Sequence, residues 1–93
     1  MAQQNIRYHL VFFGEVQGVG FRFTSRTMAV QRRITGWVRN TDGGQVEITA
    51  EGDPGDLKDF VGELKGCFSD YITGCEVNES QATGEFTRFD IHL

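Results

Sequence analysis

The sequence is poor in the residues that metal centres and disulfide scaffolds require. It contains two cysteines and two histidines, and neither Cys67 nor Cys75 has another Cys or His close by in the chain. A zinc site is therefore not expected. In a reducing compartment the two thiols are expected to stay free, with a disulfide between them as the alternative.

Positive charge and long apolar runs are scarce as well. Nine lysines and arginines stand against 13 acidic residues, so the formal net charge is −4. A field of that sign opposes docking on nucleic acid or anionic lipid, and neither is expected as a partner. The run LVFF at 10–13 is far too short to span a membrane, and the N-terminus lacks a signal-peptide pattern. We expect a cytoplasmic protein whose residues 1–93 form a single domain.

The first half of the chain contains three strand patterns and one helix. Residues 6–14 are partly apolar on both faces, as in a central strand. Residues 21–33 are predicted to be helical, with Gly36 as the stop signal. Residues 35–40 and 45–52 are predicted to be strands, joined by TDGG, whose Asp-Gly pair is a strong hairpin signal.

The alternation within 45–52 predicts a sheet with one solvated face. Its apolar residues alternate with Glu47, Thr49 and Glu51, which we expect to face water. Phe13 and Trp37 are candidates for the same open face. There we expect aromatic pairing across strands, with ligand binding as the alternative.

The second half contains the clearest helix of the chain. Asp53 is a candidate N-cap, Pro54 suits the first turn, and apolar residues follow at helical spacing until Gly66. Two further strands are predicted over residues 73–80 and 86–93. The resulting order is β-α-β-β-α-β with an extra short C-terminal strand. This order predicts an α+β, ferredoxin-like sandwich, in which an antiparallel sheet carries two helices on one face.

This fold would bring two separate segments together. A right-handed crossover makes the strands 6–14 and 35–40 parallel, with one strand between them, so that their ends lie about 10 Å apart at the same edge. The first strand ends in the glycine-rich segment GEVQGVGFR, residues 14–22, and the second ends at Asn40.

The glycine-rich segment has the features of an anion cradle. Gly18 and Gly20 allow successive backbone N–H groups to turn toward one point, and the segment leads into a helix N-terminus. Arg22 carries a planar fork that suits two phosphate oxygens. The segment lacks the Gly-Lys-Ser/Thr of a Walker loop and has only part of the Rossmann glycine spacing. These residues alone are equally compatible with an ordinary loop, in which the glycines are needed for steric reasons and Arg22 is a solvated helix residue.

The segments GEVQGVGFR and GWVRN together resemble the acylphosphatase family, and the resemblance covers nearly the whole chain. It implies the ferredoxin-like fold and a metal-free, cofactor-free hydrolysis of acyl phosphates to a carboxylate and inorganic phosphate. Arg22 would match the family's phosphate-binding arginine, and Asn40 the asparagine that positions the attacking water. A monomer is expected. The backbone N–H groups that would hold the phosphoryl oxygens belong to Gln17, Gly18, Val19, Gly20 and Phe21.

The other residues are compatible with such a substrate. No nucleophile with its base lies near the loop in the sequence; His9 and His92 are expected on the surface, and Glu15 is expected to point into solvent. A site without a general acid can expel only a good leaving group, such as a carboxylate whose conjugate acid has a pKa of about 4. Phosphate monoesters, with alcohol leaving groups, are among the slowest compounds to hydrolyse.

Three alternatives remain at this point. An RNA-recognition domain shares the element order, but residues 45–52 contain none of the stacking aromatics that such a domain needs. A non-catalytic anion sensor could use the same fold, although it would not need Asn40. The larger hydrogenase-maturation carbamoyltransferases open with an acylphosphatase-like domain whose loop also reads VQGVGFR. Because this chain stops at Leu93, we expect a free-standing enzyme instead.

Overall fold

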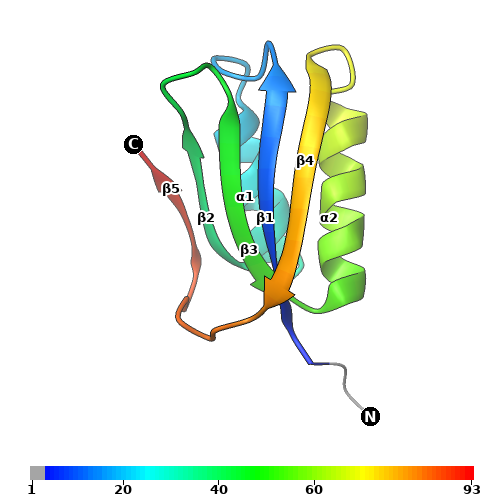
Figure 1. Ribbon diagram of the computed structural model, residues 1–93, viewed down its shortest axis with the longest axis vertical. Coiled ribbons are helices and arrows are strands. Elements are labelled where there is room, and N and C mark those ends of the chain that lie inside the picture. The colour runs from blue at the N-terminus through cyan, green and yellow to red at the C-terminus, as the bar shows by residue number, and fades with distance from the viewer. Residues whose placement is uncertain (1–3) are drawn as a thin grey trace.

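The structure is a computed structural model that describes residues 4–93. It confirms the predicted order of elements and the α+β, ferredoxin-like fold, with both helices on the same side of the sheet (Figure 1). The sheet order is β4-β1-β3-β2-β5, and it is mixed because β2 and β5 run parallel while all other neighbours are antiparallel. The elements are β1 (Ile6–Gly14), α1 (Phe21–Gln31), β2 (Thr35–Asn40), β3 (Val46–Gly52), α2 (Pro54–Cys67), β4 (Ile72–Gln81) and β5 (Phe89–His92).

The sheet brings the ends of β1 and β2 to the same edge, as the crossover rule predicts. Both strands pair antiparallel with β3, so they run parallel to each other with β3 between them. Val46 pairs with Phe12 on one side and with Asn40 on the other, which places these two residues on one rung of the sheet. The loop that follows β1 and the β2–β3 hairpin lie together at the upper edge of Figure 1.

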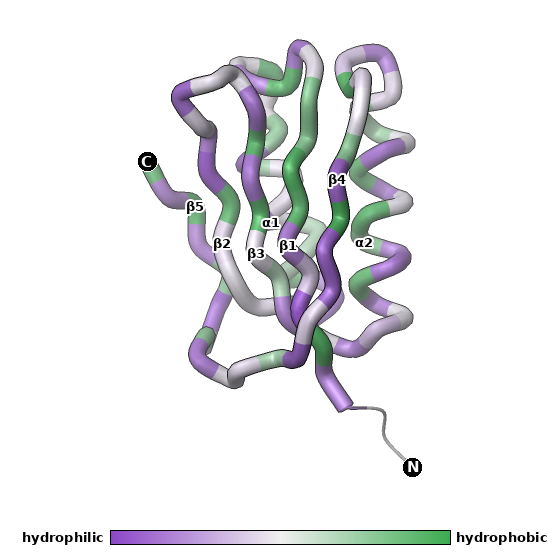
Figure 2. Tube along the Cα trace, viewed as in Figure 1, coloured by the Kyte–Doolittle hydropathy of each residue, from purple (hydrophilic) through white to green (hydrophobic). Residues whose placement is uncertain are grey.

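The core lies between the sheet and the two helices. Hydrophobic residues recur along β1 and α2 between hydrophilic ones (Figure 2), and the inward-facing positions are buried. Helix α2 buries the predicted apolar positions and is capped by Asp53, whose carboxylate accepts hydrogen bonds from the N–H of Gly55 at 2.9 Å and of Asp56 at 3.3 Å. Helix α1 buries Ser25, whose hydroxyl is satisfied by donating to the carbonyl of Phe21 at 2.7 Å.

Gly36 was wrongly predicted to end the first helix. Helix α1 ends at Gln31, and the chain then turns through Arg33, which adopts a φ of 57°. Gly36 lies inside β2 with a φ of 138°, and a Cβ there would lie 1.9 Å from the carbonyl oxygen of Thr49. The requirement for glycine comes from the close approach of β3. Gly66 likewise does not end α2, which continues to Cys67.

The hairpin between β2 and β3 is confirmed, but its positive φ falls on a different glycine. Gly44 has a φ of 88°, and its N–H donates to the carbonyl of Thr41 at 3.3 Å. The N–H of Thr41 in turn donates to the carbonyl of Gln45 at 2.9 Å. The loop therefore has three residues, with the left-handed position last, rather than the two-residue turn that an Asp-Gly pair favours.

The expectation of a fully solvated open face is wrong at the far end of β3. Thr49 and Glu51 are only 6% and 3% exposed, respectively. The carboxylate of Glu51 accepts hydrogen bonds from Arg7 Nε at 2.7 Å and from the N–H groups of Thr83 and Gly84 at 2.9 and 3.0 Å. Residues of the β4–β5 connection thus cover this end of the face. Burial raises the pKa of Glu51, but these donors outweigh it and hold the pKa below its usual value.

The aromatic residue Trp37 pairs across strands as expected, with an unexpected partner. Its ring stacks on His92 of β5, with ring centroids 5.3 Å apart. Phe13 is half-buried on β1.

Cys67 and Cys75 are free, as expected. Between residues 4 and 93, no helix has the length and hydrophobicity that crossing a bilayer would need.

Candidate active site

The loop after β1 leaves the sheet through a glycine with a positive φ. The register between β1 and β4 shifts between Phe13 and Gly14. Gly14 has a φ of 121°, and a Cβ on it would lie 2.1 Å from the carbonyl oxygen of Tyr71. The next residue, Glu15, donates its N–H to that same carbonyl at 2.9 Å. Only glycine can bring the chain this close to Tyr71 while turning it out of the sheet.

Two further glycines shape the loop through their backbone conformation. Gly18 and Gly20 adopt φ values of 80° and 82°, in the left-handed region. No atom lies within 4 Å of a Cβ built on either residue, so space does not require glycine there. The left-handed backbone does, because it costs an ordinary residue about 1–2 kcal/mol. Alternating left- and right-handed residues turn successive N–H groups toward one side of the loop.

Helix α1 begins at this loop without a capping side chain. Gly20 is its N-cap, and the carbonyl of Gly20 accepts the first helical hydrogen bond from Thr24 at 3.0 Å. In the described part of the chain, no side chain caps the first N–H groups of α1, and its first turn has no acidic residue. The positive end of the helix therefore remains available to an anion.

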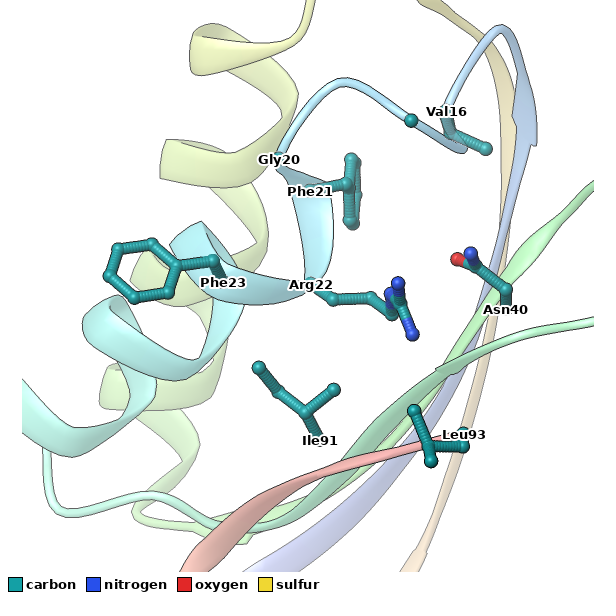
Figure 3. Close-up of a pocket in the computed structure, with 9 residues that line it drawn as sticks. Val16, Gly20, Phe21, Arg22, Phe23, Asn40, Ile91 and Leu93 are labelled. Carbon is teal, nitrogen blue, oxygen red and sulfur yellow. The ribbon is translucent and has the colours of Figure 1, made fainter.

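A pocket of about 260 Å³ opens beside the loop (Figure 3). Arg22 reaches into it from α1, and Asn40 reaches in from the end of β2, so that the guanidinium and the carboxamide point toward each other. Within residues 4–93, Arg22 makes no ion pair. The pocket is lined by Val16, Gly18, Gly20, Phe21, Arg22, Phe23, Asn40, Ile91 and Leu93.

The carboxamide of Asn40 has an unusual environment. Its Oδ1 atom is buried and accepts no hydrogen bond from any residue that the structure describes. Leaving a buried acceptor unsatisfied costs about 1–3 kcal/mol, and such groups are rare in folded proteins. In this conformation the oxygen has almost no surface open to solvent, so the carboxamide must turn into the pocket before a water molecule there can donate to Oδ1.

The structure does not place all the predicted site residues in the pocket. Gly18, Gly20 and Phe21 line it together with the two polar side chains described above. Val19 instead packs against the hydrophobic core. Gln17 directs its side chain to the hairpin, where Nε2 donates to two backbone carbonyls.

Apart from Phe21, sequence reasoning missed the apolar side chains of the pocket, which are Val16, Phe23, Ile91 and Leu93. Ile91 lies on β5, which reaches the site because it pairs in parallel with β2, opposite Val38. Phe23 is 66% exposed and points away from Arg22 in Figure 3, and Leu93 is also exposed. The alternation of residues 86–93 predicted a strand, but nothing in it indicated the strand with which β5 would pair.

The remaining titratable candidates are not among the residues that line the pocket. His9 is on the opposite face of the sheet, where Nε2 lies 2.6 Å from the carboxylate of Glu47. His92 is exposed, and Glu15 is exposed as expected. Within residues 4–93, no three His, Cys, Asp or Glu side chains are grouped as a metal site would require.

The fold and the pocket together define a class of protein. Within residues 4–93, an α+β sandwich presents an uncapped helix N-terminus, a glycine loop, an arginine without an ion pair and an unsatisfied amide oxygen around one small cavity. This combination is typical of proteins that bind and process a phosphate group.

Comparison with known proteins identifies the family. The profile of the acylphosphatase family matches residues 8–91. The chain is 39% identical to an acylphosphatase of Bacillus velezensis over 87 residues, which make up 92% of this chain and 97% of that protein. The chain therefore belongs to the acylphosphatase family, and the expectation of an enzyme of this family is confirmed.

Solved structures agree with this assignment. The crystal structure of the acylphosphatase from Bacillus subtilis matches with a TM-score of 0.86 at 36% identity, covering 95% of this chain and 99% of that one. Full-length HypF, solved in a phosphate- and nucleotide-bound form, also matches with a TM-score of 0.86, at 28% identity. That match covers 100% of this chain and 12% of HypF, so the same fold also occurs as a small part of a longer protein.

Proposed function

We propose that this protein hydrolyses the carboxyl–phosphate anhydride of acyl phosphates, without a metal ion, to a carboxylate and inorganic phosphate. One observation carries the proposal. Arg22 and Asn40, whose Oδ1 accepts no hydrogen bond from residues 4–93, line the same pocket from different elements, next to the N-terminus of α1. A free cation, backbone donors and a water acceptor are thereby available to one phosphoryl group.

In this mechanism the phosphoryl group is bound by the loop and by Arg22. The backbone N–H groups of residues 17–21 donate to its oxygens, and the guanidinium donates in a bidentate manner. Negative charge on the equatorial oxygens is stabilised in the transition state by these prepositioned donors. They provide the positive potential for which many phosphoryl-transfer enzymes use a metal ion.

Asn40 positions the attacking water. Its Oδ1 accepts a hydrogen bond from the water, which fixes the direction in which a lone pair of the water faces phosphorus. The water oxygen forms a bond to phosphorus while the bond from phosphorus to the acyl oxygen breaks, and the carboxylate leaves with that electron pair. The proton of the water passes to a phosphate oxygen of the substrate, so the site needs no protein base.

The same mechanism explains the choice of substrate. None of the described residues that line the pocket is a general acid, because their polar side chains are an arginine and an asparagine. A carboxylate can leave unprotonated, since its conjugate acid has a pKa of about 4. An alcohol would have to leave as an alkoxide, so phosphate monoesters should be poor substrates.

We further propose that residues 1–93 form a single domain and that the protein is a cytoplasmic monomer. The single domain is supported by the relatives, because the chain covers 97% of the Bacillus velezensis protein and 99% of the Bacillus subtilis structure. Light scattering of the purified protein tests the oligomeric state.

The deciding experiment measures turnover of benzoyl phosphate and acetyl phosphate by the purified protein, with and without EDTA. We expect hydrolysis of both, at a rate that EDTA does not change. Arg22→Ala should lose most of the affinity for inorganic phosphate, measured as the inhibition constant or by calorimetry, together with most of the turnover. Arg33→Ala removes the same charge from an exposed position at the other end of α1 and should behave as wild type.

Phosphate binding without any turnover would identify a sensor and refute the proposed reaction. Loss of activity in EDTA would refute only the metal independence of the proposed reaction.

A further inference from the structure

The side chain of Gln17 joins the glycine loop to the β2–β3 hairpin. Its Nε2 donates one hydrogen bond to the carbonyl of Thr41 and another to the carbonyl of Gln45, both at 2.8 Å. Both protons of the amide nitrogen are therefore used. Because both acceptors are carbonyls, only the NH2 end of the carboxamide can face them.

The two acceptors belong to the residues that flank the Asn40 rung of the sheet. Thr41 directly follows Asn40, and Gln45 directly precedes Val46, with which Asn40 pairs. Gln17 therefore holds the hairpin at the point where it carries the carboxamide of Asn40.

The hairpin itself is internally stiff, so it should move as a unit. The N–H of Thr41 donates to the carbonyl of Gln45 at 2.9 Å. The N–H of Gln45 donates to Thr41 Oγ1 at 3.2 Å, and that hydroxyl donates to Gln45 Oε1 at 2.6 Å. A tilt of the hairpin would consequently carry Asn40 with it.

The loop is otherwise attached to a different part of the molecule. Glu15 binds the carbonyl of Tyr71, just before β4, on the far side of β1 from the hairpin. Over the described range 4–93, the two hydrogen bonds of Gln17 are the ones that link loop residues 15–20 to hairpin residues 41–45. The sheet already fixes the ends of β1 and β2, because Phe12 and Asn40 both pair with Val46. Gln17 adds the direct link between the loop beyond β1 and the hairpin that follows Asn40.

We propose that Gln17 is a positioning residue that sets the distance between the phosphate cradle and the water-binding carboxamide of Asn40. The inference rests on the proposed function, since it assumes that Asn40 orients the water. Substitution of the side chain leaves the backbone N–H of Gln17 and the guanidinium of Arg22 in place. Its loss should therefore lower kcat much more than it weakens phosphate binding.

The test compares Gln17→Met, Asn40→Ala and the double variant in the turnover of benzoyl phosphate and in inhibition by inorganic phosphate. Methionine has a similar length but no donor. We expect Gln17→Met to lower kcat by about 10-fold to 100-fold, because a misplacement of about 1 Å can cost that much. Its inhibition constant for phosphate should stay within about 2-fold of wild type, as expected when only the water is misplaced.

The double variant provides the decisive comparison. If Gln17 acts through Asn40, Gln17→Met should cost nothing more once Asn40 is already alanine. The exposed Gln31, at the end of α1, provides the matched control, and Gln31→Met should leave kcat unchanged.

A second variant gives a readout that a purely structural role would not move. Gln17→Glu keeps the shape, but as a carboxylate it offers no donor to the two carbonyls. When protonated it recovers one O–H donor. We expect kcat of Gln17→Glu, relative to wild type at the same pH, to rise as the pH falls through the pKa of that carboxyl group.

Two kinetic results would overturn the inference. In the first, the losses in kcat of Gln17→Met and Asn40→Ala add up in the double variant. In the second, the inhibition constant for phosphate rises as much as kcat falls, which would assign Gln17 to the cradle instead. If instead Asn40→Ala itself keeps full activity, the proposed role of Asn40 has failed.

If wild type shows no turnover, the proposed function has failed, and the placement is tested by NMR of the Asn40 side-chain amide. Gln17→Met should increase its mobility. Unchanged Asn40 signals would overturn the inference independently of any activity.

Discussion

At the scale of single residues, the pocket differs from the opposite face of the sheet in how a buried polar group is satisfied. The buried carboxylate of Glu51 accepts four hydrogen bonds from distant segments, whereas the buried Oδ1 of Asn40 has no partner among residues 4–93. The free energy of an unsatisfied buried acceptor lowers the stability of the fold. Such a cost is expected where a group is kept ready for a ligand.

Asn40→Ala should therefore separate activity from stability. We expect kcat for benzoyl phosphate to fall about 10²-fold to 10³-fold or more, as when one aimed polar group is removed from an active site. Phosphate binding should be nearly normal. The melting temperature should be equal to that of wild type or higher, because the variant no longer buries an unpaired oxygen. A lower melting temperature with intact kcat would show that Asn40 has a structural role instead.

At the scale of elements, the two helices differ at their N-termini in a way that follows from their use. Helix α2 has a carboxylate cap from Asp53, which satisfies its first N–H groups. Helix α1 begins at Gly20, and within the described chain no side chain caps it. A carboxylate at that end would occupy the donors and repel a phosphate group. The element that contributes to the site is thus the one without a local cap.

Gly36 in β2 and Gly44 in the β2–β3 hairpin are required for different physical reasons, and substitution by alanine should separate these reasons. Gly36→Ala would place a Cβ 1.9 Å from a backbone oxygen of Thr49, at a φ of 138°. We expect a loss of about 2–6 kcal/mol in the free energy of unfolding, because overpacking and a strained φ each cost about 1–3 kcal/mol.

Gly44→Ala is the matched comparison. Gly44 has a φ of 88° and open space around it, so only the backbone cost of about 1–2 kcal/mol should remain. Urea unfolding of both variants measures the two costs. Equal losses would show that the contact with Thr49 is relieved by a small shift of β3.

At the scale of the whole molecule, Glu51 connects segments that are distant in the sequence. It binds Arg7 of β1 and the N–H groups of Thr83 and Gly84 in the β4–β5 connection. This connection leads into β5, which supplies Ile91 to the pocket. One buried carboxylate therefore helps to fix the edge strand on which part of the site depends.

The low pKa of Glu51 predicts a loss of stability in acid. Burial raises the pKa of Glu51. The donors from Thr83, Arg7 and Gly84 lower it by more than burial raises it, so the pKa in the folded protein lies below the value of about 4.3 in the unfolded chain. The unfolded state then binds a proton first as the pH falls, and the stabilising contribution is lost from the unfolded pKa down through the folded pKa.

Unfolding in urea at a series of pH values tests this. Wild type should lose stability steeply below about pH 5. Glu51→Gln should be less stable near neutral pH and should show a flatter profile in acid. Part of the loss of stability in acid should remain in this variant, because the pKa of Glu47 is lowered as well. Burial raises the pKa of Glu47, but His9 and Arg39 lower it by more. The exposed Glu79→Gln serves as control and should retain the wild-type profile. An unchanged slope in Glu51→Gln would refute the assignment.

The sequence by itself determined the features that local patterns encode. Alternating and helical periodicities indicated the order of elements, Asp53 indicated the start of α2, and the crossover rule placed the ends of β1 and β2 at one edge. The two motifs carried the resemblance to the family. These signals are local because they depend on backbone conformation and on which face of a strand or helix is apolar.

Only the tertiary structure decided what depends on contacts between distant segments. The burial of Glu51, the need for glycine at position 36 and the presence of Ile91 in the pocket each depend on which backbone approaches which. Gln17 shows this most clearly, because its motif suggested a backbone role in the cradle while its side chain binds the hairpin. The letters of a sequence specify donors and acceptors, but the partner of each is fixed only when the chain is packed.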